Sequence, residues 1–366
     1  MADADITPTL PTGAVRPVAV VTGASSGIGM ATAIEFAKHG YNLVLAARRR
    51  KELDKVAAEC EEHAAVAFAV PTDTTDDKAV HALADAAVQR FQHIDVWVND
   101  AGVYLTGKFE DTPLEDMRRV FETNFFGYVH GSHAALTEFR RAGHGTLINV
   151  SSVNASAPQP YLGIYSASKA AVRTLDESLR MELRLDGLQN DIHVCTVMPA
   201  SVDTNLPQNS ANYTGQEVQA LEPVYDPAYI AKQIVKLVRW PRREIIVGPV
   251  GKLMALQNAY LPGMYERQIS KFTRADLLSD KPAIITAGNL FEPVESNQGM
   301  RGGWREHRMR ADRMHASIGI GAALASVLAM GVGIALLKRH GTPAHHHHEH
   351  HRHHHHGHGK PHTLFS

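Results

Sequence analysis

The sequence predicts an α/β fold built on a doubly wound parallel sheet of seven strands, with a C-terminal helical extension. Between residues 17 and 251, seven short apolar runs alternate with helical patterns. The runs are apolar almost throughout, as in strands covered on both faces, and the helical stretches are long enough for right-handed crossovers. The predicted strands are residues 18–22, 42–47, 65–70, 94–99, 146–151, 192–198 and 244–248.

Composition favours a folded protein whose partner is a small molecule. The chain has 366 residues, 44% of them hydrophobic, which is enough for a sizeable core. Its 37 Lys and Arg residues nearly balance its 38 Asp and Glu residues, so no long-range field favours nucleic acid. Cys60 and Cys195 form neither a CxxC motif nor a zinc-ligand pair. We therefore expect two buried thiols and no metal site in the folded domain.

The chain divides into five predicted segments. Residues 1–16 contain acids and prolines without the apolar stretch of a signal peptide, so we expect a flexible leader. Residues 17–251 form the α/β domain, and residues 252–315 form a cap and linker. Residues 316–337 are a predicted transmembrane helix that contacts membrane lipid, and residues 338–366 are a disordered, histidine-rich tail.

The transmembrane prediction rests on 22 residues without a charge, 316–337. As a helix they would extend roughly 33 Å, enough to cross a hydrocarbon core of about 30 Å. Five arginines between residues 301 and 313 precede this stretch, and only Lys338 and Arg339 follow it closely. We therefore expect the folded domain on the cytoplasmic side of a membrane. The alternative is a buried helix of the soluble domain, which the many Ala and Gly residues of the stretch would suit.

A glycine-rich loop, "TGASSGIG" at residues 22–29, follows the first predicted strand and leads into a helical pattern. Its glycines allow a tight strand-to-helix turn, close approach of the backbone to a pyrophosphate, and a helix N-terminus aimed at negative charge. The alternative is an ordinary strand-to-helix turn. The cofactor-binding residues expected from this loop are Gly23, Ser25, Ser26, Gly27, Ile28 and Gly29.

The end of the second strand favours NADP(H) over NAD(H). An NAD enzyme would place a carboxylate there to hold the ribose 2′-hydroxyl, but Ala47 is followed by three arginines. We expect Arg48 to pair with a 2′-phosphate, and Arg49 and Arg50 to belong to a solvated helix start. Asp73, past the third strand, is expected to accept a hydrogen bond from the adenine amino group; the alternative is a helix N-cap.

Four residues form the predicted catalytic constellation. Tyr165 and Lys169 of "YSASK" are four positions apart, so on a helix they share a face. A nearby ammonium stabilises a phenolate, so we expect Lys169 to lower the pKa of Tyr165. Ser152, at the end of the fifth strand, would hydrogen-bond the same substrate oxygen. Asn124 interrupts a helical apolar pattern; its amide would anchor a water for proton relay, or the residue simply kinks the helix.

These motifs resemble those of the short-chain dehydrogenase/reductase family over roughly residues 17 to 250. The loop at 22–29 is similar to that family's TGxxxGxG, "YSASK" to its YxxxK motif, and Asn124, Ser152, Tyr165 and Lys169 to its catalytic tetrad. The resemblance implies a Rossmann-like domain, hydride transfer between nicotinamide and a carbonyl or alcohol, and a homo-oligomer. It also implies that the tyrosine exchanges the proton, the lysine grips the nicotinamide ribose, the serine orients the carbonyl and the asparagine holds the relay water.

Two further segments resemble the family with one change each. "NDAG", residues 99–102, has Asp100 where the family has Asn, a change that would affect a hydrogen bond that stabilises the sheet. "PASVDT", residues 199–204, has Ala200 where the family has Gly. The cofactor contacts that the resemblance implies here are Asn99, Ala101 and Gly102 on the adenosine half, and Pro199, Val202 and Thr204 near the carboxamide, in addition to Tyr165 and Lys169.

The leading hypothesis is an NADPH-dependent reductase, or the reverse dehydrogenase, anchored to a membrane and acting on a hydrophobic, lipid-derived carbonyl or alcohol. One alternative is an NADP-binding sensor or scaffold without catalysis, against which the intact tetrad argues. Another gives the main role to the histidine-rich tail as a metal buffer, although the tail lacks fixed geometry. A serine hydrolase is disfavoured because Ser151 and Ser152 are not in a GxSxG motif. Residues 205–225 are expected to set substrate specificity.

Overall fold

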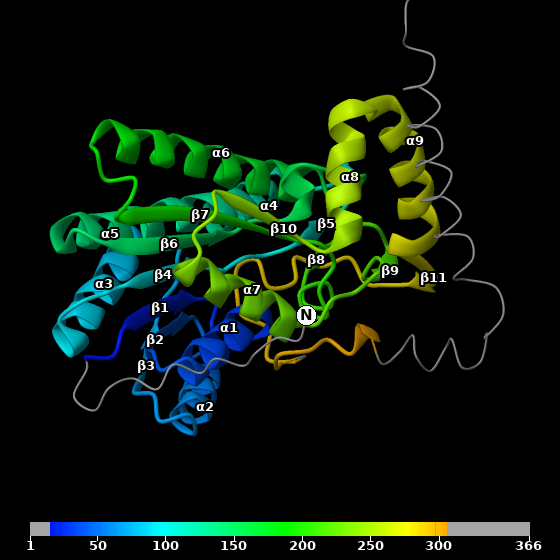
Figure 1. Cartoon of the computed structure of the whole chain (residues 1–366). Coiled ribbons are helices and arrows are strands. Elements are labelled where there is room, and N and C mark those ends of the chain that lie inside the picture. The colour runs from blue at the N-terminus through cyan, green and yellow to red at the C-terminus, as the bar shows by residue number, and fades with distance from the viewer. Residues whose placement is uncertain (1–14, 297, 306–366) are drawn as a thin grey trace, which may run out of the picture. The chain divides into compact units, whose positions relative to one another are not determined.

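A seven-stranded parallel sheet forms the centre of the folded domain (Figure 1). The computed structural model describes residues 15–296 and 298–305. The strand order is β10-β7-β6-β4-β1-β2-β3, and every pair is parallel. This confirms the predicted sheet. Its strands are β1 (Val18–Thr22), β2 (Asn42–Ala47), β3 (Ala67–Pro71), β4 (Val96–Asn99), β6 (Gly145–Val150), β7 (Ile192–Pro199) and β10 (Glu244–Val247).

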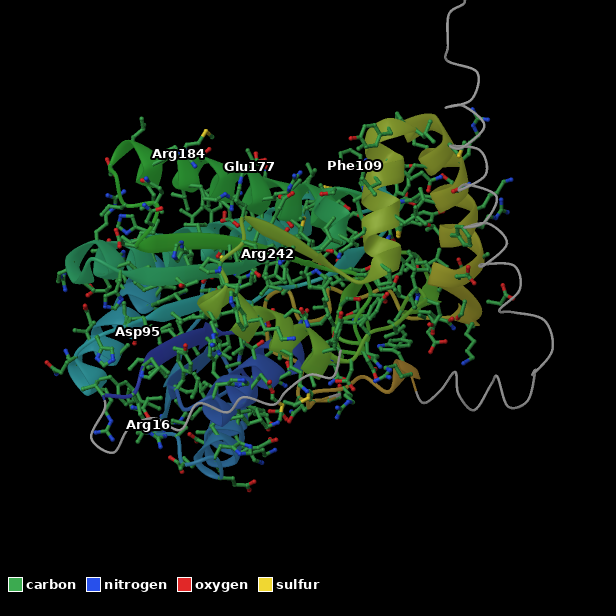
Figure 2. All side chains as sticks on the ribbon, viewed as in Figure 1. Arg16, Asp95, Phe109, Glu177, Arg184 and Arg242 are labelled. Carbon is green, nitrogen blue, oxygen red and sulfur yellow. The ribbon has the colours of Figure 1, made fainter. Side chains whose placement is uncertain are left out.

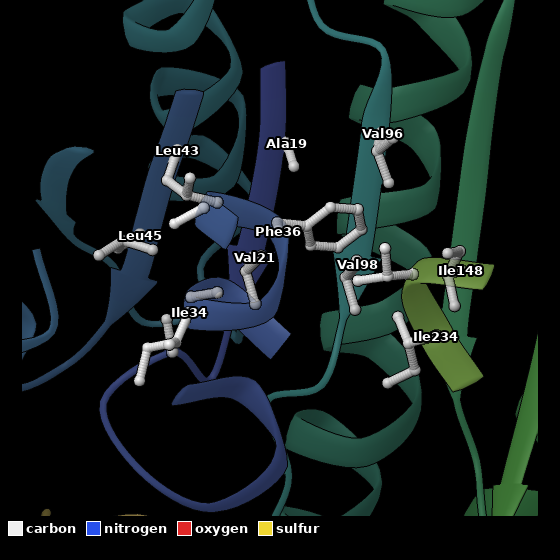
Figure 3. Close-up of a cluster of buried hydrophobic side chains, with 14 of the residues drawn as sticks. Ala19, Val21, Ile34, Phe36, Leu43, Leu45, Val96, Val98, Ile148 and Ile234 are labelled. Carbon is white, nitrogen blue, oxygen red and sulfur yellow. The ribbon is translucent and has the colours of Figure 1, made fainter. Parts of the chain in front are cut away.

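Helices cover both faces of this sheet, because side chains alternate along each strand and both sets are apolar. On one face, Val21 of β1 packs with Phe36 and Ile34 of α1 and with Ile234 of α7 (Figure 3). On the other face, Val20 packs in a cluster with residues of α3, α5 and α6. The helices are α1 (Gly27–Lys38), α2 (Arg50–Glu61) and α7 (Pro227–Arg239) on the first face, and α3 (Asp77–Phe91), α5 (Gly127–Ala142) and α6 (Gly163–Leu185) on the second.

The strand order reverses between β1 and β4, and this places the ligand-binding edge. The chain proceeds outward from β1 through β2 to β3, and then returns to lay β4 on the other side of β1. Such a switch point opens a crevice outside the carboxyl ends of the strands. Arg16 and Asp95, which precede β1 and β4, mark the opposite end of the sheet (Figure 2).

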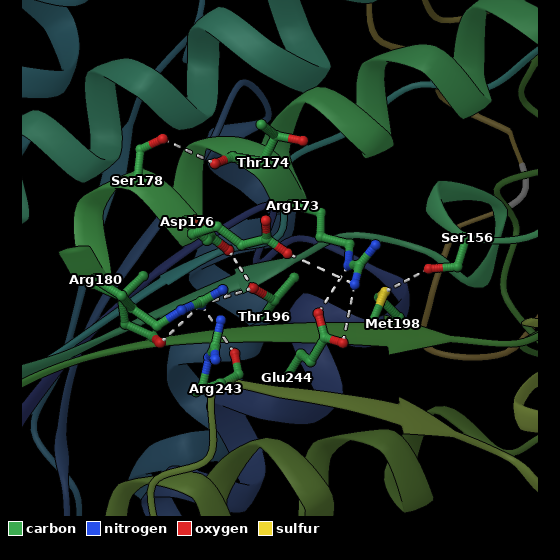
Figure 4. Close-up of polar contacts among 12 residues, drawn as sticks. Ser156, Arg173, Thr174, Asp176, Ser178, Arg180, Thr196, Met198, Arg243 and Glu244 are labelled. Carbon is green, nitrogen blue, oxygen red and sulfur yellow. Dashed lines mark hydrogen bonds and ion pairs between the residues drawn. The ribbon is translucent and has the colours of Figure 1, made fainter. Parts of the chain in front are cut away.

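Buried polar contacts fasten α6 to three strands. Asp176 is fully buried and accepts hydrogen bonds from Asn149 Nδ2 of β6 (2.5 Å) and Thr196 Oγ1 of β7 (2.6 Å). Nearer the surface, Arg173 pairs with Glu244 of β10 through Nε (2.8 Å) and Nη2 (3.1 Å) (Figure 4). Because a buried carboxylate is stable only with its hydrogen bonds satisfied, these contacts fix the position of the helix.

The chain after β10 adds a helical hairpin and a returning segment. The hairpin consists of α8 (Pro249–Tyr260) and α9 (Pro262–Phe272), and a π-helical turn (Thr273–Leu277) leads to β11 (Leu278–Pro282). β11 pairs antiparallel with β9 (Gln216–Val218), and the short strands β5 (Leu105–Thr106) and β8 (Ala211–Asn212) pair parallel. No helix in the described part of the chain is long and apolar enough to span a bilayer. The predicted transmembrane stretch, 316–337, lies outside the described residues, as do most of the leader and the whole tail.

Candidate active site

Loops at the carboxyl ends of six strands line one long pocket, which we call the main pocket. It extends from the loop after β3 to the loop after β7, past the start of α1 and the side chains of Tyr165 and Lys169. The crevice therefore lies where the strand order predicts it. The predicted site residues that line it are Gly23, Ser25, Ser26, Gly27, Ile28, Arg48, Asp73, Ala101, Gly102, Tyr165, Lys169 and Thr204.

A second, more apolar cavity, the side pocket, adjoins the main pocket. Ser152 lines it, and so do Pro199 and Val202 from the end of β7 and the loop that follows. Tyr165 contributes to both pockets, as do Ile28 and Thr204. A group bound in one pocket and a group bound in the other therefore meet at the Tyr165 side chain.

The glycine loop has the geometry that a pyrophosphate needs. Gly23 and Gly27 adopt positive φ values of 69° and 56°, which turn the chain sharply from β1 into α1. A Cβ on Gly23 would lie 2.8 Å from the amide nitrogen of Ala101, and one on Gly29 would lie 2.4 Å from the carbonyl oxygen of Gly23. Only glycine fits at these contacts. The start of α1 thus faces the main pocket, where the Gly27 N–H donates to the carbonyl oxygen of Gly299 (3.1 Å). A helix N-terminus at this place suits the negative charge of a dinucleotide.

Two arginines, not one, point into the adenosine end of the main pocket. Arg48 donates from Nη1 to the carbonyl oxygen of Phe291 (2.8 Å) and from Nη2 to that of Asn289 (2.9 Å). Arg49 was expected in a solvated helix start, but it lines the pocket and donates to the Val294 carbonyl (3.0 Å) and Ser25 Oγ (3.3 Å). Arg49 is the N-cap of α2, as a helix start requires, but its side chain faces the pocket and not solvent, so that part of the expectation is wrong. Arg50 is exposed and pairs with Asp54 in the helix.

Asp73 lies at the adenosine end but does not cap α3. Its Oδ1 accepts hydrogen bonds from the backbone N–H (3.0 Å) and the hydroxyl (2.9 Å) of Thr75, and Oδ2 lies 3.3 Å from Arg119 Nη2. The N-cap of α3 is Asp76, which accepts from the N–H groups of Lys78 and Ala79. The alternative interpretation of Asp73 as the cap is therefore wrong.

Tyr165 and Lys169 both lie on α6 and are both buried. The Lys169 ammonium donates to the carbonyl oxygen of Val150 (2.9 Å) and to the hydroxyl of Tyr128 (3.0 Å). Tyr165 makes a side-chain hydrogen bond with Ser152, and the ring of Tyr104 meets it edge-on at 4.8 Å. The helical spacing thus brings the phenol, the ammonium and the serine hydroxyl to one edge of the sheet, as predicted.

The electrostatics of this cluster differ from the sequence-based expectation. The pKa of Tyr165 is raised to about 12. Burial is the largest cause of this shift, the hydrogen bond with Ser152 opposes it, and the charge of Asp100 adds to it. Burial likewise lowers the pKa of Lys169, which the Asp100 charge partly restores. The net shift of the Tyr165 pKa is thus upward, opposite to the direction expected from a nearby ammonium. Desolvation dominates, and the ammonium is engaged by other partners.

Asn124 is a fully buried residue of a π-helical turn (Glu122–Phe126) between α4 (Leu114–Phe121) and α5. Its Oδ1 accepts from the N–H of Val103 (2.8 Å), and its Nδ2 donates to the Val103 carbonyl (2.9 Å) and Ser168 Oγ (3.2 Å). These three hydrogen bonds occupy the side-chain amide that was expected to anchor a relay water, and that role stays a prediction. Asn124 ties the loop after β4 to α6.

Asn99 also lies away from the pocket wall. Its side chain is buried between β4 and β6, where it accepts from Trp97 Nε1 (2.8 Å) and donates to Asn149 Oδ1 (2.8 Å). The expected position beside the adenosine half is thus corrected to a place in the polar core. Ala101 and Gly102, by contrast, line the main pocket.

Asp100 is a site residue whose role the sequence did not reveal. Its carboxylate lines the main pocket and accepts a hydrogen bond from the N–H of Gly29. Desolvation raises the pKa of Asp100, while the Lys169 charge and the Gly29 hydrogen bond lower it. The sequence feature that could have indicated this role is the Asp at position 100, where the family motif NNAG has Asn. The carboxylate links the glycine loop electrostatically to Lys169.

Comparison with known proteins agrees with this geometry. Residues 17–214 match the family model for short chain dehydrogenases. The uncharacterized oxidoreductase YxnA of Bacillus subtilis (strain 168) is 32% identical over 268 residues, which cover 73% of this chain and 75% of that protein.

Two solved structures share the fold. A short-chain dehydrogenase/reductase from Burkholderia phymatum in complex with NAD has a TM-score of 0.62 and 26% identity, over 69% of this chain and 95% of that one. An alcohol dehydrogenase from the archaeon Thermococcus sibiricus, complexed with 5-hydroxy-NADP, has a TM-score of 0.56 and 27% identity, over 63% and 96% of the two chains. Both cofactor types therefore occur among these structures.

Replacing Asp100 by Asn should move the pH profile of catalysis to lower pH. The ionised carboxylate raises the pKa of Tyr165, so its removal lowers that pKa. Alcohol oxidation needs the phenolate, and its acid limb should shift down by on the order of one pH unit. The measurement is kcat against pH for an alcohol that the wild type oxidises.

The matched control is Asp85→Asn, which removes an exposed carboxylate on α3 and should leave the profile in place. An unchanged or upward-shifted profile for Asp100→Asn would show that the Asp100 charge does not act on Tyr165.

Proposed function

The chain belongs to the short-chain dehydrogenase family, and we propose that it transfers a hydride between NADP(H) and a carbonyl or alcohol group of a largely apolar small molecule. The family membership makes it an NAD(P)-dependent oxidoreductase. The observation that carries the proposal is the position of Tyr165, which is shared by the main and side pockets and hydrogen-bonded to Ser152.

The chain's own residues supply the proton and the orientation. When bound, the nicotinamide supplies or accepts the hydride. In carbonyl reduction the Tyr165 hydroxyl donates its proton to the substrate oxygen while the carbonyl carbon gains the hydride, so a carbonyl becomes an alcohol. Ser152 donates a hydrogen bond to the same oxygen and orients it. Lys169, held by Val150 and Tyr128, places a positive charge behind the reacting groups.

The preference for NADP(H) rests on two guanidinium groups at the adenosine end, where the charges of Asp73 and Glu292 also act on Arg48. Arg48 and Arg49 both line the main pocket there. Within the described residues, their hydrogen-bond partners are carbonyl and hydroxyl oxygens rather than carboxylates. A guanidinium oriented by neutral acceptors keeps its full charge and its remaining N–H donors for a phosphate.

The substrate class follows from the lining of the side pocket. Apolar side chains predominate, among them Val153, Leu221 and Leu277, and Tyr104 lies beside the catalytic tyrosine. Asn154, Gln159 and Gln219 are the amides on its wall. Residues from the 205–225 segment contribute to this wall, as expected of a specificity loop. An apolar carbonyl compound with few polar groups suits this cavity.

The membrane setting is a separate part of the proposal and rests on the sequence alone. The uncharged stretch 316–337 and the arginines before it support a domain tethered on the cytoplasmic side. A homo-oligomer, likewise, is supported by the family resemblance alone.

Replacing Tyr165 by Phe should abolish most of the turnover, because the proton donor is lost while the ring remains. We expect kcat to fall by about a hundredfold or more. The measurement is NADPH oxidation with a panel of carbonyl compounds, alongside the NADPH dissociation constant, which should stay near the wild-type value.

The control is Tyr260→Phe, a change at an exposed tyrosine of α8, which should have no effect on kcat. If Tyr165→Phe retained more than about a tenth of wild-type turnover, the catalytic assignment would fail.

Replacing Arg48 by Ala should weaken NADPH binding by about tenfold or more, because a charge-assisted contact contributes about 1.5–3 kcal/mol. NADH binding should change little. Calorimetric titration of both cofactors measures the effect, and Arg50→Ala, at the exposed neighbour, is the control. Tighter binding of NADH than NADPH by the wild type would refute the cofactor preference.

Deleting residues 316–337 should release the protein from membranes, because the apolar stretch is the proposed anchor. The full chain should float with liposomes in a density gradient, and the deletion variant should stay in the dense fractions. Turnover of a water-soluble carbonyl should be alike for both. A full chain that fails to float would count against the membrane setting.

A further inference from the structure

A segment outside the matched family region crosses the main pocket. Residues 289–296 and 298–304, which we call the strap, follow β11 and are drawn in orange in Figure 1. Asn289, Pro293 and Val294 of the strap line the main pocket itself. The family match ends at residue 214, so this part of the pocket wall is an addition to the matched region.

The strap is fastened at the adenosine end by a buried leucine and an arginine. Leu290 is fully buried in a cluster with Val103, Leu105 and Val120. Its carbonyl oxygen accepts a hydrogen bond from Arg119 Nε (2.9 Å). This anchoring holds the neighbouring carbonyls of the strap at fixed positions.

The strap is also fastened over the glycine loop and near the nicotinamide end. The Gly299 carbonyl accepts from the N–H of Gly27 (3.1 Å) and from Asn205 Nδ2 (3.2 Å). Farther on, Trp304 donates from Nε1 to the carbonyl oxygen of Thr204 (2.9 Å) and from its backbone N–H to Asp203 Oδ1 (2.8 Å). The strap therefore has anchors along the whole length of the pocket.

The strap and the two pocket arginines meet through main-chain carbonyls. Asn289 and Phe291 each accept one hydrogen bond from Arg48, and Val294 accepts one from Arg49. A guanidinium has five N–H donors, so each arginine keeps donors in reserve. A carbonyl orients the side chain without neutralising its charge, whereas a carboxylate would do both.

We infer that the strap is a cofactor-specificity element: its carbonyls at residues 289, 291 and 294 hold Arg48 and Arg49 in place to receive the 2′-phosphate of NADP(H). An arginine that is already immobilised loses less conformational entropy when the phosphate binds, so the strap strengthens NADPH binding selectively. This inference rests on the NADP preference proposed above. It adds that the preference depends on a segment that does not belong to the matched family region.

The test is Leu290→Ala in the full chain, with NADPH and NADH binding measured by calorimetry. Loosening the strap should lower the affinity for NADPH by about five- to tenfold, and change that for NADH by less than about twofold. The pair 2′,5′-ADP and 5′-AMP, which differ only in the 2′-phosphate, should show the same selectivity. Leu237→Ala, at a buried position of α7, controls for general loss of stability and should keep the wild-type ratio.

A milder variant covers the case in which Leu290→Ala fails to fold. Phe291 is 40% exposed and its ring lies 5.8 Å from the Arg119 guanidinium, so Phe291→Ala loosens the strap without opening a cavity. It should weaken NADPH binding in the same selective way, by about two- to threefold.

Three outcomes would overturn the inference. Equal losses for both cofactors would mean that the strap only covers the pocket, and no change would mean that the arginines need no support. Tighter NADPH binding in the variants would mean that the strap carbonyls compete with the phosphate. A wild type that binds NADH as tightly as NADPH would instead show, before any variant is made, that the proposed cofactor preference is wrong.

Discussion

The close approach of two backbones, at Gly23 and Ala101, is the constraint on which the rest of the site depends. A Cβ on Gly23 would come within 2.8 Å of the Ala101 nitrogen, so the ends of β1 and β4 meet only because a side chain is absent. The turn that follows aims α1 at the crevice, and the loop after β4 carries Gly102 and Val103 along the pocket wall. Asn124 then ties Val103 to Ser168 of α6. The contact between the main chains at Gly23 and Ala101 thus helps to set the position of the helix that carries Tyr165.

The catalytic cluster is tuned by burial more than by any single ion pair. Tyr165 and Lys169 are both enclosed, and desolvation pushes their pKa values in opposite directions, up for the phenol and down for the ammonium. Both shifts favour neutral groups, and Asp100 opposes this for the lysine by attracting its positive charge. The chain therefore stabilises an ammonium in a desolvated place with a carboxylate that also braces the glycine loop through Gly29.

The sequence predicted most of the fold and the positions of the main candidate catalytic groups, because both depend on local patterns. Apolar runs indicated all seven strands, and the spacing of Tyr165 and Lys169 placed both groups on one helical face. The differences from the predictions involve contacts between segments distant in the chain. Asn124 and Asn99 find partners across the core, and Arg49 turns toward a loop some 245 positions away. No periodicity or motif in the sequence predicts the strap, because its contacts with the arginines are made by backbone atoms that every residue possesses.

Because the strap contacts the arginines through backbone atoms, its sequence can change over evolution without loss of these contacts. Arg48, Arg49 and Arg119 recognise the peptide groups of residues 289, 290, 291 and 294, and the identity of the side chains hardly enters those hydrogen bonds. Homologues are therefore free to diverge in this stretch while preserving its path. A sequence alignment would show the strap as a variable segment. Its contribution to the pocket would become visible only when the structures are superposed.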